Sequence, residues 1–309
     1  MARARASTSV RRAAGALAAG LPRHLLAPLD PARFAPSAAR PVRAKARLLD
    51  PDTEIRPHQH AWAQVAIAVS GVAHLSAETA TYLVPAWRAL WVPPGIEHVL
   101  RVVETTELRT LYIHQAPGEA GPGVAAAEQA AWRHCRVLEV SPLLRELVLQ
   151  MGVHPDDSPV PDSEALARER RLGTLVLDEL RRAATLPLGI TMPRDKRLRA
   201  LCQAVLADPT RHGSLAGWAA QAGASERTIA RLFRDELATS FGPWRQQVLL
   251  GRALTLSAQG RPMAVIAAEL GYASASAFSA MVRRSVGLPP TRLLAWPVAS
   301  ASPSANRAR

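Results

Sequence analysis

The stretch WAAQAGASERTIARLFRDELATSFGPW (218–244) resembles a second one further on, IAAELGYASASAFSAMVRRSVGLPPTRL (266–293). In both, an apolar residue is followed by an Ala-Ala pair, then by a glycine, and then by a serine that can cap a following amphipathic helix. A short helix, a tight turn and a second helix form the helix-turn-helix pattern. The repeat therefore predicts an all-α C-terminal domain with two helix-turn-helix motifs.

The second helix of the first copy has one apolar face and one basic face. Its inward positions are Ile229, Leu232 and Phe233, and its basic positions are Arg227, Arg231 and Arg234. Guanidinium groups in such a stripe can bind guanine edges or phosphates in a major groove. A solvated charged face on an ordinary helix is the alternative. Two tandem copies within residues 194–309, which carry sixteen basic and six acidic side chains, favour DNA.

The second copy offers a weaker reading surface. Its inward positions are Phe278, Met281 and Val282, whereas its outward stripe is mostly Ala and Ser before two arginines. We expect this helix to dock mainly on phosphates. The predicted DNA contacts are Ser225, Arg227, Thr228, Arg231 and Arg234 in the first copy, and Ser274, Ser276, Ser279, Arg283 and Arg284 in the second. A helix over 241–258, roughly 27 Å long, would hold the two recognition helices about one DNA turn apart.

Composition and charge limit the class of protein. The 309 residues are 48% hydrophobic and 20% charged, with no apolar run long enough to span a membrane. Two cysteines, Cys135 and Cys202, show no pairing pattern, which predicts free thiols and a cytoplasmic location. The net charge of +13 is uneven, because residues 48–193 are net acidic and both flanking segments are basic. Only part of the chain is therefore suited to a polyanion.

The pattern along the chain predicts an α+β protein in several parts. Short strand-like runs fill 47–115, which favours a small β-barrel. The predicted parts are a disordered basic tail (1–46), the barrel (47–115), a helical linker and dimerisation segment (116–184), the DNA-binding domain (185–296) and a disordered tail (297–309). A secretory signal is disfavoured in the basic tail, because its apolar run is short and followed by more arginines.

Two helices, over 141–151 and 162–183, are expected to begin at Ser141 and Ser163. Their apolar stripes predict a homodimer interface. The stripes comprise Leu143, Leu144, Leu147 and Val148 in the first helix, and Leu172, Leu175, Val176 and Leu180 in the second. Packing of both stripes on the barrel of the same chain is the alternative.

The segment from about Asp195 to Leu293 resembles the DNA-binding domain of AraC/XylS-type transcription regulators. The resemblance rests on TIARLFRDE, SFGPWRQQ, IAAELGYASASAFSAMVRR and GLPP. Ala238 replaces a glycine that usually follows the first recognition helix, and Ala280 and Val282 depart from the pattern of the second. The resemblance implies a sequence-specific regulator that binds double-stranded DNA, takes RNA polymerase as a further partner, and senses an effector in an N-terminal cupin-like barrel.

Cupin barrels have a His-x-His motif followed by Glu and Gly, and a second Pro-x-Gly-x-x-His motif. RPHQHAWAQVAIAVSG (56–71) supplies His58, His60 and Gly71, with Gln64 in place of Glu, and PPGIEH (93–98) supplies His98. Histidines two apart on a strand face one side. His58, His60 and His98, with Gln64 helping, are therefore predicted to bind Ni, Zn or Cu as an effector, with no catalytic cofactor.

Two alternatives to the metal remain open: a metal-free pocket for an organic effector, and histidines that only pack the barrel. A further alternative is a cupin metalloenzyme, of dioxygenase or isomerase type, fused to a DNA-binding domain. Gln64 opposes it, since loss of the carboxylate weakens a redox metal site, and no acid/base pair adjoins the histidines. A regulator that is not an enzyme is the favoured interpretation.

Overall fold

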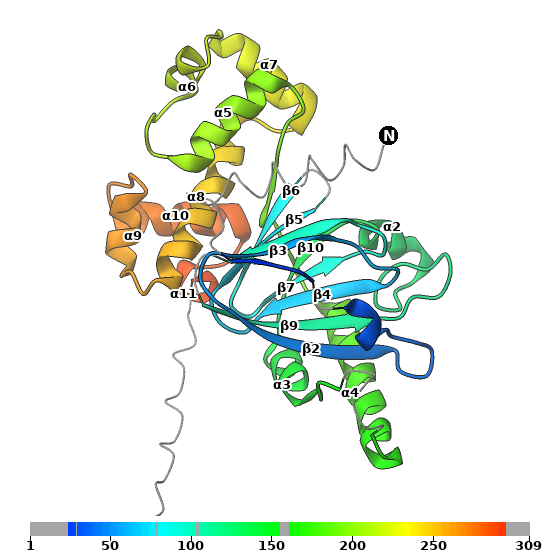
Figure 1. Ribbon diagram of the computed structural model, residues 1–309. Coiled ribbons are helices and arrows are strands. Elements are labelled where there is room, and N and C mark those ends of the chain that lie inside the picture. The colour runs from blue at the N-terminus through cyan, green and yellow to red at the C-terminus, as the bar shows by residue number, and fades with distance from the viewer. Residues whose placement is uncertain (1–23, 29, 78–79, 103–104, 155–160, 295–309) are drawn as a thin grey trace, which may run out of the picture.

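The computed structural model describes residues 24–28, 30–77, 80–102, 105–154 and 161–294. The N-terminal half contains two six-stranded sheets that face one another (Figure 1). The first sheet runs in the order β1 (His24–Leu26), β3 (Thr53–His58), β8 (His98–Val102), β5 (Val72–Ala77), β6 (Ala80–Pro85) and β12 (Gly189–Thr191). The second runs β11 (Thr185–Leu186), β10 (Arg136–Glu139), β7 (Arg88–Val92), β4 (Ala63–Ala68), β9 (Thr106–Ile113) and β2 (Val42–Leu49).

The β-rich domain extends beyond the predicted limits of 47–115 at both ends. Strand β2 begins at Val42, inside the segment predicted as a disordered tail, because alternating side chains let it pair with β9 along its whole length. The first residues of the predicted DNA-binding domain (185–296) instead add β11 to one sheet and β12 to the other. Most of the remaining predicted tails, 1–23 and 297–309, lie outside the described residues.

Two helices cover the outer face of the second sheet: α3 (Pro142–Gln150) and α4 (Ser163–Arg182). Their buried apolar side chains join one core cluster with outward residues of β2, β4, β7 and β9. From the predicted dimer stripes, Leu144, Leu147, Val148, Val176 and Leu180 are buried in this cluster, Leu172 packs against it, and Leu143 and Leu175 are exposed. The stripes therefore mainly pack on the barrel of the same chain. Ser141 caps α3 as predicted, whereas Asp162 rather than Ser163 caps α4.

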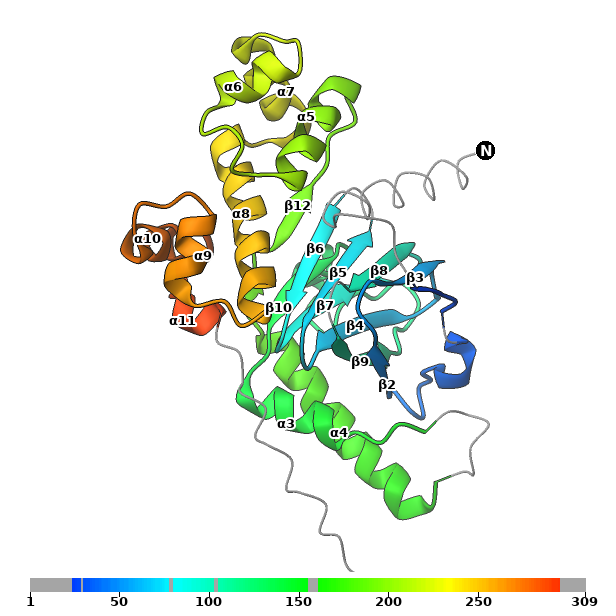
Figure 2. The ribbon, with the colours of Figure 1, turned by 60° about the vertical axis from the view of Figure 1, so that its left-hand side comes forward.

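The C-terminal half is helical, as predicted. Its helices are α5 (Lys196–Ala207), α6 (Leu215–Gln221), α7 (Glu226–Leu237), α8 (Phe241–Ala258), α9 (Met263–Glu269), α10 (Ala275–Val286) and α11 (Pro290–Leu293). Three shorter helical turns lie in the N-terminal half: η1 (Pro31–Phe34), η2 (Ala126–Glu128) and α2 (Gln129–Trp132). Pairs α6–α7 and α9–α10 form the two helix-turn-helix motifs, and α8 connects them (Figure 2).

Helix α8 also joins the DNA-binding domain to the β-domain, because it contacts β5, β6 and β12 (Figure 2). A Cβ on Gly251 would lie 2.5 Å from Cδ1 of Leu83, so a side chain at this position would displace Leu83. The indole nitrogen of Trp244 donates to the carbonyl of Thr191 at 2.9 Å. The two domains therefore share one continuous apolar core.

Two further sequence predictions concern the whole chain. Cys135 and Cys202 are buried and form no disulfide with each other, as predicted. Among the described residues, no helix is long and apolar enough to cross a bilayer.

Candidate nucleic-acid interface and effector site

Helix α7 is fixed by a cap at its start and an aromatic cluster beneath it. The Ser225 hydroxyl accepts the backbone N–H of Thr228 at 3.1 Å, which satisfies a free donor of the first turn. Ile229 and Phe233 are fully buried, and the Phe233 ring lies 5.7 Å from the ring of Trp244. The inward prediction for these two residues is confirmed, and the opposite face of α7 is thereby turned to solvent.

The basic stripe of α7 lies on that solvent-facing side. Arg227, Arg231 and Arg234 are all exposed. Within the described part of the chain, none of the three makes an ion pair or a hydrogen bond through its guanidinium. Unpaired guanidiniums on one helix face are free to bind phosphates and guanine edges. Thr228 is half-buried, and its hydroxyl lies 2.8 Å from that of Ser225.

Helix α10 repeats this framework with a different surface. Ser274 caps it through the N–H of Ala277 at 3.1 Å, and Phe278, Met281 and Val282 are buried as predicted. Its exposed residues include Ser276, Ala280, Arg283 and Arg284, whereas Ser279 is half-buried. The arginines lie in its last turn, so the N-terminal part of this helix presents only short side chains.

In the β-domain, the three motif histidines meet at one end of the first sheet. His58 ends β3 and pairs with His98 on β8, and their ring centroids are 4.3 Å apart. The His60 ring lies 5.2 Å from that of His98. His60 is not on the strand as predicted, because β3 is irregular between Ile55 and His58 and ends there. The three rings come together nevertheless, since the turn after β3 folds back.

Each imidazole uses Nδ1 to bind a backbone carbonyl two residues away. The carbonyls belong to Arg56, Trp62 and Ile96, at 2.8 to 2.9 Å. A carbonyl only accepts, so Nδ1 carries the proton and Nε2 holds a lone pair in the neutral ring. Burial lowers the pKa of His58 to about 4, and also lowers the pKa of His60 and His98, which keeps all three neutral at pH 7.

The Nε2 atoms of these rings have different surroundings. His60 Nε2 lies 2.9 Å from Oε1 of Gln64, and both atoms are acceptors in the neutral state. Rotating the Gln64 amide by half a turn would present its NH₂ group instead. His98 Nε2 is fully buried and, among the described residues, has no hydrogen-bond partner.

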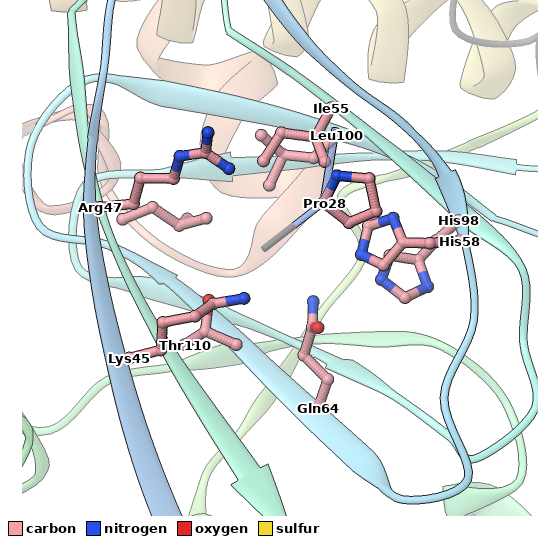
Figure 3. A pocket seen from close by; sticks show the side chains of 10 residues that line it. Pro28, Lys45, Arg47, Ile55, His58, Gln64, His98, Leu100 and Thr110 are labelled. Carbon is pink, nitrogen blue, oxygen red and sulfur yellow. The ribbon is translucent and has the colours of Figure 1, made fainter. Parts of the chain in front are cut away.

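A small cavity beside the histidines is lined by cationic side chains. Its volume is about 20 Å³, room for roughly one or two water molecules. Lys45 and Arg47 extend into it from β2, opposite His58 and His98, while Gln64 enters from β4 (Figure 3). None of the ten lining residues is acidic. Burial, with a smaller contribution from Arg47, lowers the pKa of Lys45 to about 8.

Sequence reasoning missed Lys45 and Arg47. They belong to VRAKARLL (42–49), in which basic and apolar residues alternate. The alternation places the basic residues on one face of the strand and the apolar residues on the other. In a barrel the apolar face usually points to the interior. Here α4 covers Val42, Leu48 is 68% exposed, and the basic face points inward. The alternation therefore indicates a strand, but which of its two faces points into the barrel depends on where α4 packs.

The donor types suit Ni, Zn or Cu, but the surroundings do not fit a divalent cation. Two cationic groups face the cavity, and Gln64 supplies only a neutral oxygen that is already close to His60 Nε2. The described residues contain no group of three or more His, Cys, Asp or Glu side chains arranged to hold a metal. A metal effector therefore stays a prediction without support from this arrangement.

Comparisons with known proteins match both halves. A helix-turn-helix domain model matches residues 218–295, and an AraC-like ligand binding domain model matches residues 46–184. The HTH-type transcriptional regulator NimR of Escherichia coli is 31% identical over 238 residues, which cover 77% of this chain and 81% of that protein. The arabinose operon regulatory protein of Salmonella typhimurium is 30% identical over 120 residues, 38% of this chain and 42% of that protein.

Among solved structures, ToxT of Vibrio cholerae aligns with 82% of this chain and over 98% of the ToxT chain. The sequence identity is 11% and the TM-score is 0.33, a similarity too low to support any statement about this chain. The relatives found by sequence are transcription regulators, not enzymes, so the fused cupin enzyme is set aside. Identity over most of both chains, together with the two domain matches, shows that this chain belongs to the AraC family of DNA-binding transcription regulators, with a ligand-binding domain before its helix-turn-helix domain.

Proposed function

We propose that this regulator uses α7 and α10 as its two recognition helices on double-stranded DNA, and that α7 carries most of the sequence readout. The single observation behind this is the exposed, unpaired stripe of Arg227, Arg231 and Arg234. Each guanidinium can donate to O6 and N7 of a guanine together. Arg283 and Arg284 of α10 contact phosphates, while Ser276 and Ser279 make at most single hydrogen bonds.

The test is fluorescence anisotropy of the full chain on the DNA upstream of its own gene. We expect binding that survives an excess of unrelated duplex of equal length, and a preference for the upstream DNA that is smaller by about 1–3 kcal/mol in Arg231→Ala. Arg133→Ala is the matched control, because Arg133 is an exposed arginine of the β-domain. Equal affinity for upstream and unrelated DNA would contradict the proposal.

We further propose a homodimer formed through the outward face of α4. Residues 164, 168, 171, 175, 178 and 182 recur at spacings of four and three, so they share one helix face. Five of them are exposed and Asp178 is half-exposed. Antiparallel pairing of two copies about residue 173 would place Glu164 against Arg182, Arg168 against Asp178, and Arg171 beside the exposed Leu175 of the partner.

Analytical ultracentrifugation tests this dimer with a charge exchange. Arg168→Glu places like charges opposite each other and should give a monomer, since such contacts suppress association. The double variant Arg168→Glu/Asp178→Arg restores opposite charges and should recover the dimer. A monomeric wild type at tens of micromolar, both free and on DNA, would contradict the proposal.

Finally, we propose that an effector bound at His58, His60, His98 and Gln64 controls DNA binding. Strand β8, which carries His98, pairs with β5, and β5 and β6 contact α8. These strands therefore connect the effector cavity to α8, the helix that sets the distance between the two recognition helices. His60→Ala should remove the effector response yet preserve DNA binding without effector. Contact with RNA polymerase and a cytoplasmic location stay predictions.

A further inference from the structure

The cavity beside the histidines holds two cationic groups that no acidic side chain among the described residues neutralises. Lys45 donates one hydrogen bond, to the hydroxyl of Tyr112 at 2.6 Å, and Arg47 makes no side-chain hydrogen bond or ion pair with any described residue. The lining includes no carboxylate. Both side chains extend from β2 into the cavity, and both residues are half-buried (Figure 3).

Such an arrangement is unfavourable in the empty protein. Removing a cation from water has a free-energy cost that only an opposite charge or good hydrogen bonds offset. The Tyr112 hydroxyl is neutral, since burial raises its pKa further above the usual value. An anionic group placed between Lys45 and Arg47 would therefore gain charge-assisted hydrogen bonds from both.

A second unsatisfied group lies across the cavity. His98 Nε2 is completely buried without a described partner, and Nδ1 already donates to Ile96. The neutral ring therefore presents a lone pair that needs a donor, such as a hydroxyl or an amine. The Lys45 ammonium does not fill this role, because its short contact is with Tyr112.

We propose that the effector is a small organic acid with a hydroxyl or amino group beside its carboxylate. Its carboxylate lies between Lys45 and Arg47, and its donor group binds His98 Nε2. This inference rests on the proposed effector control and names the ligand class for that site. The cavity volume of about 20 Å³ has room for roughly one or two water-sized groups, so binding of the acid requires the side chains that line the cavity to move apart.

Three probes of nearly equal size separate the contributions of the two groups. Lactate has a carboxylate and an adjacent hydroxyl, propionate lacks the hydroxyl, and lactamide lacks the charge. NMR titration of the full chain detects weak binding of each. We expect lactate to bind, propionate to bind about fivefold to tenfold more weakly, and lactamide to lose at least tenfold, as for loss of a charged hydrogen bond.

Variants locate the binding in this cavity. Lys45→Met keeps most of the unbranched side chain and removes its charged end, and should weaken lactate binding about tenfold or more. Lys196→Met is the matched control, because Lys196 is exposed on α5, and should bind lactate like the wild type. Without ligand, Lys45→Met should unfold at the same or a higher temperature than the wild type, since an uncompensated cation is removed.

Several outcomes would overturn the inference: no binding of lactate, equal binding of lactate and lactamide, or unchanged lactate affinity in Lys45→Met and Arg47→Leu. Tighter binding of nickel chloride in Lys45→Met than in the wild type, with no lactate binding, would assign the site to a metal instead. Measuring DNA binding by the same protein preparations distinguishes failure of the proposed ligand class from failure of the proposed function. If DNA binding is intact and no acid binds, only the ligand class fails, and if upstream DNA is not preferred, the proposed function fails.

Discussion

The two helix-turn-helix motifs share a framework but not a surface. Helices α7 and α10 each have twelve residues, each begins at a serine cap, and each ends at a residue in the left-handed region. Yet α7 exposes arginines from its first turn to its last, whereas α10 exposes Ser and Ala before two terminal arginines. The same helix-turn-helix fold thus forms twice because buried apolar residues recur at the same spacing. The exposed residues on the opposite face, which would contact DNA, differ between the two copies.

The largest expected effects concern the shared framework. Phe233 and Phe278 are both 0% exposed, and each fills the core under its recognition helix, although Phe233 corresponds to Val282 in the repeat and Phe278 to Ile229. Replacing either with Ala leaves a cavity and should cost about 3–5 kcal/mol of stability. Similar losses in Phe233→Ala and Phe278→Ala, measured by urea unfolding of the full chain, would support equal frameworks. A loss below about 1 kcal/mol for Phe278→Ala would break the comparison.

Smaller effects are expected on the two surfaces. Arg231→Ala should cost about 1–3 kcal/mol of binding to the specific site, the value of one bidentate base contact. Arg283→Ala should weaken specific and unrelated DNA alike and reduce the slope of log K against log salt by about one. Anisotropy titrations over a range of salt concentrations measure both quantities. If both variants showed the same change in salt slope and the same preference for the specific site, the exposed faces of α7 and α10 would act alike, which would contradict the comparison.

The smallest effects concern the helix ends. Ala238 follows α7 with a φ of 49°, and Gly287 follows α10 with a φ of 72°. An L side chain is strained there, so Ala238→Gly should stabilise the protein by up to about 1 kcal/mol. Gly287→Ala should destabilise it by a similar amount, about 1 kcal/mol, although its Cβ would meet no atom within 4 Å. Thermal unfolding of both variants measures the difference, and shifts of equal sign would contradict it.

The sequence predicted the helical domain closely and the β-domain less well. Helical spacing, serine caps and glycine turns are local signals, and they place α8 at 241–258 and the caps at Ser225 and Ser274 as observed. Strands β10, β11 and β12 were missed because each is four residues or fewer and is defined by distant partners. Local patterns carry no information about such pairing.

The effector site shows the same limit. Two short motifs were enough to bring His58, His60 and His98 together, because motif glycines such as Gly71 and Gly95 occupy positive φ in the turns that the site needs. The cationic side of the cavity was not predictable in this way. Lys45 and Arg47 lie on a strand whose inward face is chosen by the packing of α4 on its other face.

The central claim, that α7 reads sequence and α10 positions the protein, has one direct test. Every base pair of the bound upstream site is substituted in turn, and binding of wild type, Arg231→Ala and Arg283→Ala is measured by anisotropy. Arg231→Ala should lose its preference at one base pair, where the wild type discriminates by about 1–3 kcal/mol, and keep the others. Arg283→Ala should keep the wild-type profile at lower affinity throughout. An unchanged profile for Arg231→Ala, with a preference lost in Arg283→Ala, would contradict the account.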